Sequence, residues 1–294
     1  MELHSFQDLL LSSVRLSVPL IFAAYGGLMS ERSGVANIAL EAYLLFSAFA
    51  AAAATSIFAS LWMGILFGLL AAGLIGFIFA IVCVYGRGDQ VVIGTAFNLL
   101  AVGSIPVMNK SLFGITGSTP ALSLQLRFTQ PLLFFGFSIL IMLSLEYLFR
   151  KTRHGLRVTA CGENPLALET QGVSSRKLRI RAVVEGSLIA GCGGIYLSLC
   201  QGSAYVREMA AGRGFIALAA LILGGWRPFP TLLACLFFAL TDAIQIQLQG
   251  KTIGEYQIPN SLVQISPYLI TLLLLIFSSR KVLAPRAINT NSID

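Results

Sequence analysis

Nine long apolar segments dominate this chain of 294 residues, and short polar segments separate them. A run of roughly 20 apolar residues is long enough to cross the hydrocarbon core of a bilayer as a helix. Only 11% of the residues are charged, far below the roughly 25% of ordinary globular domains. We therefore predict an all-α polytopic membrane protein with a single transmembrane domain, residues 1–294.

The predicted spans differ in length, and this difference bears on their number. They are Leu9–Met29, Val35–Thr55, Leu61–Tyr85, Val91–Met108, Pro131–Phe149, Ala182–Cys200, Gly214–Trp226, Pro230–Leu248 and Leu262–Phe277. Gly214–Trp226 is too short to cross a bilayer, so we expect a half-helix or a re-entrant segment there. The sequence thus predicts about eight to ten transmembrane helices, including broken or re-entrant ones.

The longest polar loop, residues 150–181, is rich in Arg and Lys. Loops with an excess of Arg and Lys face the cytoplasm, which places this loop inside the cell. With nine spans, the N-terminus then lies outside and the C-terminus inside, whereas an even number of spans would move one end to the other side. The net charge of +7 is distributed over such loops, so we expect contact with membrane lipid and no nucleic-acid partner.

The same loop carries the start and stop signals of a short helix. Asn164 suits an N-cap, Pro165 suits the first helical position, and Gly172 suits the residue after the helix end. These signals predict a helix of about two turns at the membrane surface. A helix in this place is well suited to receive force from another protein.

Two segments of the chain share the pattern G-x-x-x-I-A-L, residues 34–40 and 212–218. In the predicted topology they enter the membrane from opposite sides, which is typical of transporters built from inverted repeats. Chance similarity is the alternative, because these residue types are common in every membrane protein.

Four polar residues interrupt the predicted spans: Asn37, Glu41, Asn98 and Asp242. Asn37 and Glu41 lie four residues apart and would share one face of the second span if it is helical there. Such groups are costly in lipid, so they should face a cavity or a partner. They either form a hydrogen-bonding path for a polar solute, or Glu41 and Asp242 anchor helices by bonding to buried groups.

Catalytic motifs are missing from the sequence. There is no G-x-x-x-x-G-K-[ST] phosphate loop, no His/Cys/Glu cluster with metal-binding spacing and no nucleophile elbow. We therefore expect no catalytic residue, no metal, no cofactor and no enzymatic activity. We interpret the five cysteines as small buried apolar residues and His154 as a surface residue.

Residues 31–41, Glu-Arg-Ser-Gly-Val-Ala-Asn-Ile-Ala-Leu-Glu, resemble the ERSGVVNIGLEG signature of bacterial ABC importer permeases in the branched-chain amino acid/simple sugar superfamily. Residues 94–100, 162–165 and 212–220 resemble other hallmarks of that family, in the same order. The resemblance covers about residues 15–275 and is closest to the nucleoside-type branch. The chain departs from the family pattern at Ala42 and within residues 225–230.

The resemblance implies a permease subunit that moves a small polar solute, a nucleoside, into the cytoplasm across the bacterial cytoplasmic (inner) membrane. Riboflavin or a simple sugar are alternatives within the same class of importer. The implied partners are separate chains: an ATPase subunit that hydrolyses ATP, a second permease (a paralogue or another copy), and an extracytoplasmic solute-binding lipoprotein.

The resemblance also assigns roles to residues. It places Asn37, Glu41 and Asn98 near the translocation pathway, to which we add Asp242 because of its place in a span. The helix that couples the permease to the ATPase would comprise Glu163, Asn164, Pro165, Leu166, Ala167, Leu168, Glu169 and Gly172. A proton-coupled secondary transporter that uses Glu41 and Asp242 is the alternative from another class.

Overall fold

The computed structural model describes residues 2–86, 88–249, 252–253, 256–257, 269 and 284–288. Within these residues the chain is almost entirely helical. The helices are α1 (Glu2–Arg32), α2 (Leu40–Phe58), α3 (Leu61–Tyr85), α4 (Gln90–Phe113), α5 (Pro131–Lys151), α6 (Arg153–Glu163), α7 (Pro165–Thr170), α8 (Ser175–Tyr196), α9 (Arg213–Leu223) and α10 (Pro228–Leu248).

Short elements complete the description. A 3₁₀ turn covers Leu124–Leu126, and a π-helical turn, Leu197–Gln201, extends α8. The strands β1 (Thr252–Ile253) and β2 (Tyr256–Gln257) form one antiparallel pair in which Thr252 faces Gln257. The molecule is therefore a helical membrane domain with a minimal hairpin after α10.

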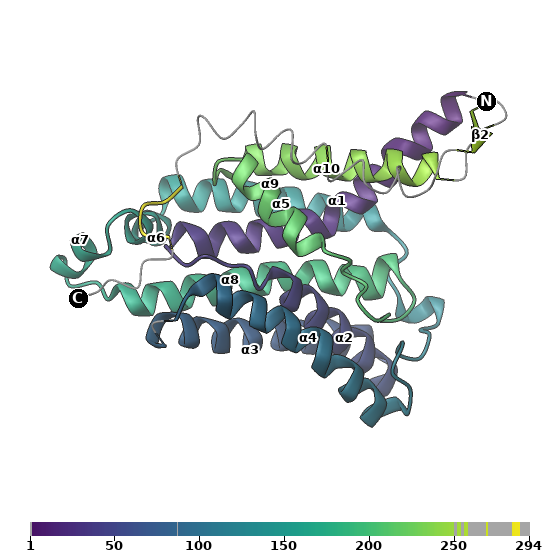
Figure 1. Ribbon diagram of the computed structural model, residues 1–294, viewed down its shortest axis with the longest axis horizontal. Coiled ribbons are helices and arrows are strands. Elements are labelled where there is room, and N and C mark those ends of the chain that lie inside the picture. Colours follow the sequence, from purple (N-terminus) through teal and green to yellow (C-terminus); the bar gives the residue numbers. More distant parts are fainter. Residues whose placement is uncertain are drawn as a thin grey trace.

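Seven helices of the described chain are long and apolar enough to cross a membrane, and α9 is a shorter apolar helix. The predicted span Leu262–Phe277 lies outside the described residues. The long helices run along the long axis of the molecule, with α6 and α7 at one end and the N-terminus at the other (Figure 1). The prediction of a polytopic all-α membrane protein is confirmed, and so is the half-helix expected near Gly214–Trp226.

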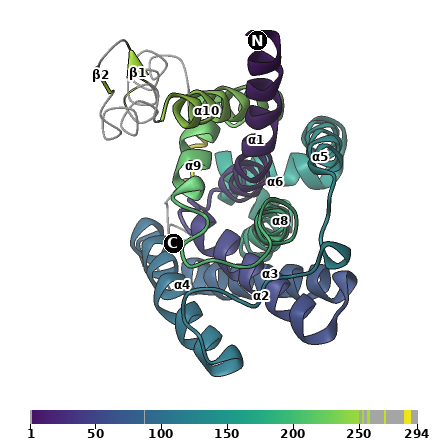
Figure 2. The same ribbon diagram turned by 90° about the vertical axis from the view of Figure 1, so that its right-hand side faces the viewer.

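Helix α8 forms the centre of the bundle, where it packs against α1, α2 and α3 (Figure 2). Glycines allow this close packing: a Cβ atom on Gly26 of α1 would lie 2.5 Å from the carbonyl oxygen of Gly186 in α8. Lipid tails give little hydrophobic drive for helix association, so close van der Waals contact between small residues stabilises such a core.

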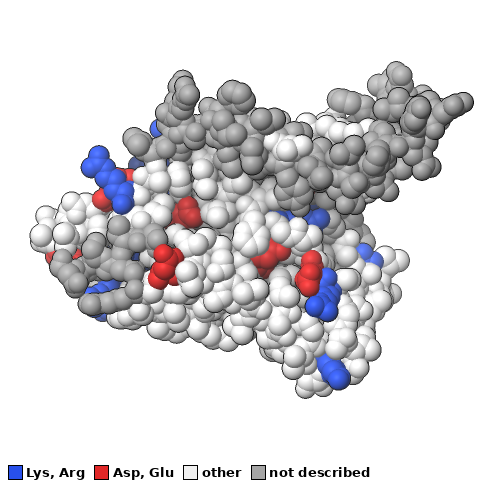
Figure 3. All heavy atoms as spheres, in the orientation of Figure 1, with Lys and Arg blue, Asp and Glu red and all other residues white. Residues whose placement is uncertain are grey.

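Basic side chains lie mainly toward the two ends of the bundle (Figure 3). The visible face in Figure 3 is mostly uncharged along its length, with basic side chains mainly toward its two ends. Arg32 at the end of α1 stacks on the ring of Phe149, with the guanidinium carbon 4.4 Å from the ring centroid. This stacking joins the end of α1 to the end of α5 beside α6, at the end of the molecule that carries α6 and α7.

The second predicted span begins later than expected. Helix α2 starts at Leu40, and the preceding residues 33–39 are irregular, with Gly34 at φ +90°. The prediction that Asn37 and Glu41 share one helical face is therefore wrong. Side chains from α1 and α4 hydrogen-bond to the backbone of this segment, and these bonds substitute for helical ones.

Candidate functional site

The irregular segment 33–39 is held by polar side chains of neighbouring helices. The side-chain oxygen of Gln90, in α4, accepts a hydrogen bond from the backbone N–H of Ala36 at 2.7 Å. The carboxylate of Glu31, in α1, accepts one from the backbone N–H of Asn37 at 3.5 Å. Irregular backbone within a membrane domain needs such partners, because lipid supplies none.

Helix α2 is capped by a residue from another helix. Its own N-cap residue, Ala39, makes no side-chain cap bond. Instead the side-chain oxygen of Asn98, in α4, accepts a hydrogen bond from the N–H of Ala42 at 2.9 Å. The amide nitrogen of Asn98 donates to the carbonyl oxygen of Ile38 at 2.9 Å. One asparagine thus satisfies a donor and an acceptor on either side of the helix start.

Helix α9 is capped in the same manner by Glu41, in the first turn of α2. One carboxylate oxygen accepts a hydrogen bond from the N–H of Gly212 at 2.8 Å, and the other accepts one from the N–H of Gly214 at 2.6 Å. Negative charge at a helix N-terminus is favourable, because the exposed N–H groups and the helix dipole are positive there. We call this meeting point of the two helix starts, formed by Glu41, Asn98, Gly212 and Gly214, the helix junction.

Before α9, the chain runs along the loop that follows α4. The N–H of Tyr205 donates to the hydroxyl of Thr119 at 3.0 Å, and the N–H of Arg207 donates to the carbonyl oxygen of Gly117 at 2.8 Å. These bonds fix residues 203–207 to the loop that follows α4. From there the chain turns inward to Glu41, and α9 then runs back toward the end of α1.

The shared pattern G-x-x-x-I-A-L has different structures in its two copies. Both copies begin with a glycine at positive φ, Gly34 at +90° and Gly212 at +79°. Residues 35–38 are then irregular, whereas residues 213–218 are helical. Hydrogen bonds join the two segments at the helix junction, but their conformations differ, so the inverted repeat stays a prediction.

A cavity of 580 Å³ opens beside the helix junction, between α2, α4, α9 and the segment before α9. Its wall contains both polar and apolar side chains. The polar members are Glu41, Thr95, Asn98 and Glu208, and the others are Leu45, Leu99, Val102, Ala211, Gly212 and Phe215. A cavity of this size with a few polar groups is typical of a site for a small organic solute.

Two of the four predicted pathway residues, Glu41 and Asn98, lie in this wall. Asn37 does not line the cavity; it is fully buried, and its amide nitrogen donates to the hydroxyl of Ser30 at 2.8 Å. Asp242 also lies outside the cavity wall, on α10, where the charge of Arg213 acts on it and on Glu41. The structure thus places Glu41 and Asn98 in the cavity wall and Asn37 and Asp242 outside it.

The helix predicted at Asn164–Gly172 is present as α7. The side-chain oxygen of Asn164 accepts a hydrogen bond from the N–H of Ala167 at 3.2 Å, and Pro165 is the first helical residue. Gly172 has φ +73°. Its backbone N–H donates to the carbonyl oxygen of Glu169, and the N–H of Val173 donates to the carbonyl oxygen of Leu168. These are the two bonds of a Schellman motif.

The two faces of α7 differ in exposure. Pro165 and Leu168 are buried against the protein. The exposed residues are Glu163, Asn164, Leu166, Ala167, Glu169, Thr170, Gln171 and Gly172. Leu166 is 53% exposed, an apolar side chain at the tip of the molecule. The carboxylate of Glu169 accepts a hydrogen bond from the hydroxyl of Ser175 at 2.7 Å.

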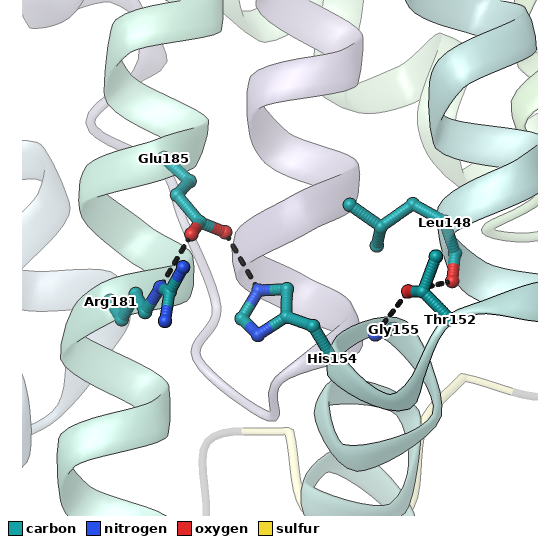
Figure 4. Close-up of polar contacts among 6 residues, drawn as sticks. All are labelled: Leu148, Thr152, His154, Gly155, Arg181 and Glu185. Carbon is teal, nitrogen blue, oxygen red and sulfur yellow. Dashed lines mark hydrogen bonds and ion pairs between the residues drawn. The ribbon is translucent and has the colours of Figure 1, made fainter.

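Helix α6, which the sequence interpretation did not separate from the loop, holds α7 against the bundle. Thr152 caps it, accepting a hydrogen bond from the N–H of Gly155 at 3.1 Å. His154 is a bonded residue, not a free surface histidine: its Nε2 lies 3.0 Å from the Glu185 carboxylate, which also binds Arg181 at 2.8 Å (Figure 4). We refer to α6 and α7 together, residues 153–172, as the coupling unit.

Close backbone contacts connect the coupling unit to segment 33–39. A Cβ atom on Gly162 would clash with the carbonyl oxygen of Arg32. The carbonyl oxygen of Gly162 also accepts a hydrogen bond from the N–H of Ala287 at 2.7 Å. Cys161 is buried here, and burial raises the pKa of its thiol above the ordinary value. The coupling unit is therefore packed directly against the residues that lead into the helix junction.

Several residues of these contacts were not singled out from the sequence. Glu208 and Phe215 line the cavity, Gln90 binds the backbone of Ala36, and Glu31 bonds across the chain to Trp226. Glu31 stands in the family-like signature, and Gln90 directly follows the helix cap Asp89. A search for polar residues near every predicted span end would have found both.

Comparison with known proteins gives a family match and several relatives. The family described as branched-chain amino acid transport system / permease component matches residues 9–278. The nucleoside ABC transporter permease protein NupC of Lactococcus lactis is 33% identical over 99% of this chain and 98% of its own length. The guanosine ABC transporter permease protein NupQ of Bacillus subtilis is 31% identical over 92% of each chain.

A more distant relative is named for a different solute. The putative glucose ABC transporter permease protein TsgC13 of Haloferax volcanii is 28% identical over 84% of this chain and 79% of its own length. No solved structure matches the chain. Relatives of this kind are transport permeases rather than enzymes.

Proposed function

This chain belongs to the permease family of branched-chain amino acid transport systems, and on this premise we propose that it imports a nucleoside as the membrane-spanning subunit of an ATP-binding-cassette importer. Its family and its apolar helices make it a multi-pass protein of the bacterial cytoplasmic membrane. The cavity beside the helix junction is the observation that carries the proposal. Its composition suits a solute with one apolar aromatic part and one polar part.

The wall of the cavity divides into two kinds of surface. Phe215, Leu99 and Val102 offer apolar contacts, and Phe215 is 49% exposed. A base ring can pack against such side chains. Asn98, Thr95 and Glu208 place hydrogen-bonding groups in the same wall, where ribose hydroxyls would find partners. The named solutes of NupC and NupQ support this choice of substrate.

We propose that Glu41 and Asn98 border the translocation pathway, and that Asn37 and Asp242 support the surrounding helices. Thr95 and Glu208 are exposed on the open side of the cavity. Polar and charged groups facing lipid are costly. A second permease, either another copy or a paralogue, would cover this side and complete the pathway.

We further propose that the exposed face of α7 docks on a separate ATPase subunit. Leu166 offers an apolar side chain for such a contact, and the basic residues nearby support a position at the cytoplasmic surface. Closure of the ATPase would then push on the coupling unit and alter access to the cavity. A solute-binding lipoprotein would deliver the solute on the other side of the membrane.

Transport by the reconstituted complex tests the proposal. The tagged chain is purified in mild detergent with its co-purifying subunits and placed in liposomes, and uptake of radiolabelled guanosine is measured. We expect uptake that needs ATP, is independent of a proton gradient, and is inhibited by unlabelled adenosine but not by glucose or riboflavin. Inhibition by glucose or riboflavin alone would overturn the nucleoside assignment.

The energy source separates the importer from a secondary transporter. Both carboxylate oxygens of Glu41 are bonded to α9, which favours an anchoring role over proton transfer. A chain that purifies without an ATPase and takes up solute with a proton gradient alone would overturn the importer proposal.

Replacing Leu166 and Glu169 together tests the coupling role. We expect ATP hydrolysis without uptake, from a variant that still inserts normally. Replacement of Trp62, which is 79% exposed and lies outside the coupling unit, is the matched control. Normal uptake by the double variant would rule out coupling through α7.

A further inference from the structure

Both ends of α9 are bonded to carboxylates that flank the irregular segment 33–39. Glu41 follows the segment and binds the start of α9. Glu31 precedes the segment, and its carboxylate accepts a hydrogen bond at 2.6 Å from the indole N–H of Trp226, just after α9. Glu31 is 4% exposed and Trp226 is 7% exposed. This contact is therefore a buried one between residues 195 positions apart.

The backbone after α9 has an unusual conformation at Gly225 and Trp226. Trp226 has φ +52° and follows Gly225 at φ +62°. A bulky residue at positive φ is uncommon and persists where surrounding contacts hold it. The bond from the indole N–H to Glu31 and the burial of the ring are contacts of this kind. They fix the direction in which the chain leaves α9.

Glu31 also connects this end of α9 to the coupling unit. Its second carboxylate oxygen accepts the N–H of Asn37. The neighbouring carbonyl oxygen of Arg32 lies against Gly162, and the carbonyl oxygen of Ser33 accepts a hydrogen bond from Nε of Arg179 at 3.3 Å. The coupling unit, the segment and the end of α9 thus form one continuous set of contacts.

The other end of α9 forms part of the cavity. Ala211, Gly212 and Phe215 line its wall. Helix α9 has 11 residues, and the continuous backbone hydrogen bonds of a helix connect its two ends. A displacement applied at Trp226 would therefore reach the cavity wall.

We infer that Glu31 is a positioning residue for transport, which holds the end of α9 through Trp226 and transmits movement of the coupling unit to the cavity wall. This inference rests on the proposed function. Glu31 does not line the described cavity, so it acts through Trp226 and α9 and has no contact with solute there.

Fluorescence of the purified chain tests the contact without any partner. The chain has two tryptophans, Trp62 and Trp226, so Trp62→Phe leaves Trp226 as the single reporter. In that background we expect Glu31→Ala to shift the emission to longer wavelength and to raise acrylamide quenching. Glu31→Gln should do so less, because its amide oxygen can still accept the indole N–H.

Glu146→Ala is the matched control for this experiment. Glu146 is paired with Arg150 within α5, so its substitution removes an ion pair of that helix and not a bond to α9. Unchanged emission and quenching in Glu31→Ala, relative to the Trp62→Phe parent, would overturn the positioning role. If Glu31→Ala fails to fold, Glu31→Leu replaces it, because leucine fills the site with an apolar side chain that cannot accept the indole N–H.

Reconstituted complexes test the role in transport. We expect Glu31→Ala and Trp226→Phe, which each remove the bond between the indole N–H and the carboxylate, to lower the solute taken up per ATP hydrolysed by about fivefold, since contacts of this kind modulate coupling to that extent. The double variant should be no worse than either single variant, because each single variant already removes the same contact. ATP hydrolysis itself should change little.

The outcomes distinguish this inference from the proposed function. The inference is overturned if the solute taken up per ATP hydrolysed stays the same. A proportional fall of uptake and hydrolysis is one such result and would indicate a structural role only. Failure of the Trp62→Phe parent to bind an ATPase or to transport would overturn the proposed function and with it the transport role of Glu31. The fluorescence result would still decide whether Glu31 holds Trp226.

Discussion

The coupling unit and the helix junction both depend on helix caps, but the caps differ in origin. In α7, Asn164 caps the helix that it begins, and Gly172 ends it a few residues later. At the helix junction, Asn98 caps α2 from 56 residues away, and Glu41 caps α9 from 171 residues away. Local caps form wherever the sequence places them, whereas distant caps exist only after the bundle has assembled.

This difference has consequences for stability. A cap on an exposed helix end competes with water, so its loss costs little. A cap within the membrane domain has no such substitute, because lipid offers no hydrogen bonds. Substitutions at the helix junction should therefore have larger effects than substitutions in the coupling unit.

Glu41→Ala should produce the largest effect. It removes the acceptor for the N–H groups of Gly212 and Gly214, and we expect a loss of about 3–5 kcal/mol in the free energy of unfolding. Thermal unfolding in detergent measures it. Glu208→Ala is the matched control, because Glu208 borders the same cavity with its side chain 57% exposed. Equal unfolding temperatures of the two variants would contradict the capping role of Glu41.

Asn98→Ala should have the next largest effect. Two hydrogen bonds to the backbone around the start of α2 are lost, for which we expect about 2 kcal/mol. Asn98→Asp should also destabilise the chain, because its carboxylate still accepts the N–H of Ala42 but cannot donate to the carbonyl oxygen of Ile38. Thr95→Ala is the control, since the Thr95 hydroxyl bonds only within its own helix in the described contacts. An effect of Thr95→Ala as large as that of Asn98→Ala would argue against the distant cap.

Gly172→Ala should cost about 1 kcal/mol, the strain of an alanine at positive φ. No atom lies within 4 Å of the added methyl group, so the cost is conformational. Gly136→Ala, also with open space around it but inside α5, is the control and should be neutral or stabilising. Both are measured by thermal unfolding. A larger loss for Gly172→Ala than for Glu41→Ala would reverse the order of the two regions.

Cys161 should report on the packing of the coupling unit without changing its stability. Burial raises the pKa of its thiol, so the thiol stays protonated and unreactive to higher pH than an exposed one. We expect maleimide to react about tenfold more slowly with Cys161 than with an exposed cysteine at Lys177→Cys near neutral pH. As the pH rises, the exposed cysteine should react first. Equal rates throughout would show that α6 is not packed as described.

The sequence was informative where the signals were local. Length and hydropathy predicted α3 at Leu61–Tyr85 with the observed bounds, and the short apolar segment was rightly expected to be a half-helix. The cap signals of Asn164 and Gly172 predicted α7. Each of these features depends on residues within a few positions of one another, so the physical rules for isolated helices apply.

The sequence was misleading where distant contacts override local preference. Residues 35–39 are apolar enough to continue a helix, yet Gln90, Glu31 and Asn98 bind the segment and its helix start in an irregular form. Glu41 and Asp242 looked alike as acids within spans. Only the fold shows that Glu41 binds the start of α9 and borders the cavity, while Asp242 lies outside that wall.

The most direct measurement is site-specific photo-crosslinking in the membrane, with a photoreactive phenylalanine derivative placed at Leu166 or, as the control, at Trp62. Leu166 is exposed on the coupling unit, and Trp62 is exposed near the start of α3. The account predicts that the probe at Leu166 crosslinks to a subunit carrying an ATP-binding phosphate loop and that the probe at Trp62 does not. Absence of that crosslink at Leu166, or its appearance at both positions, would contradict the account.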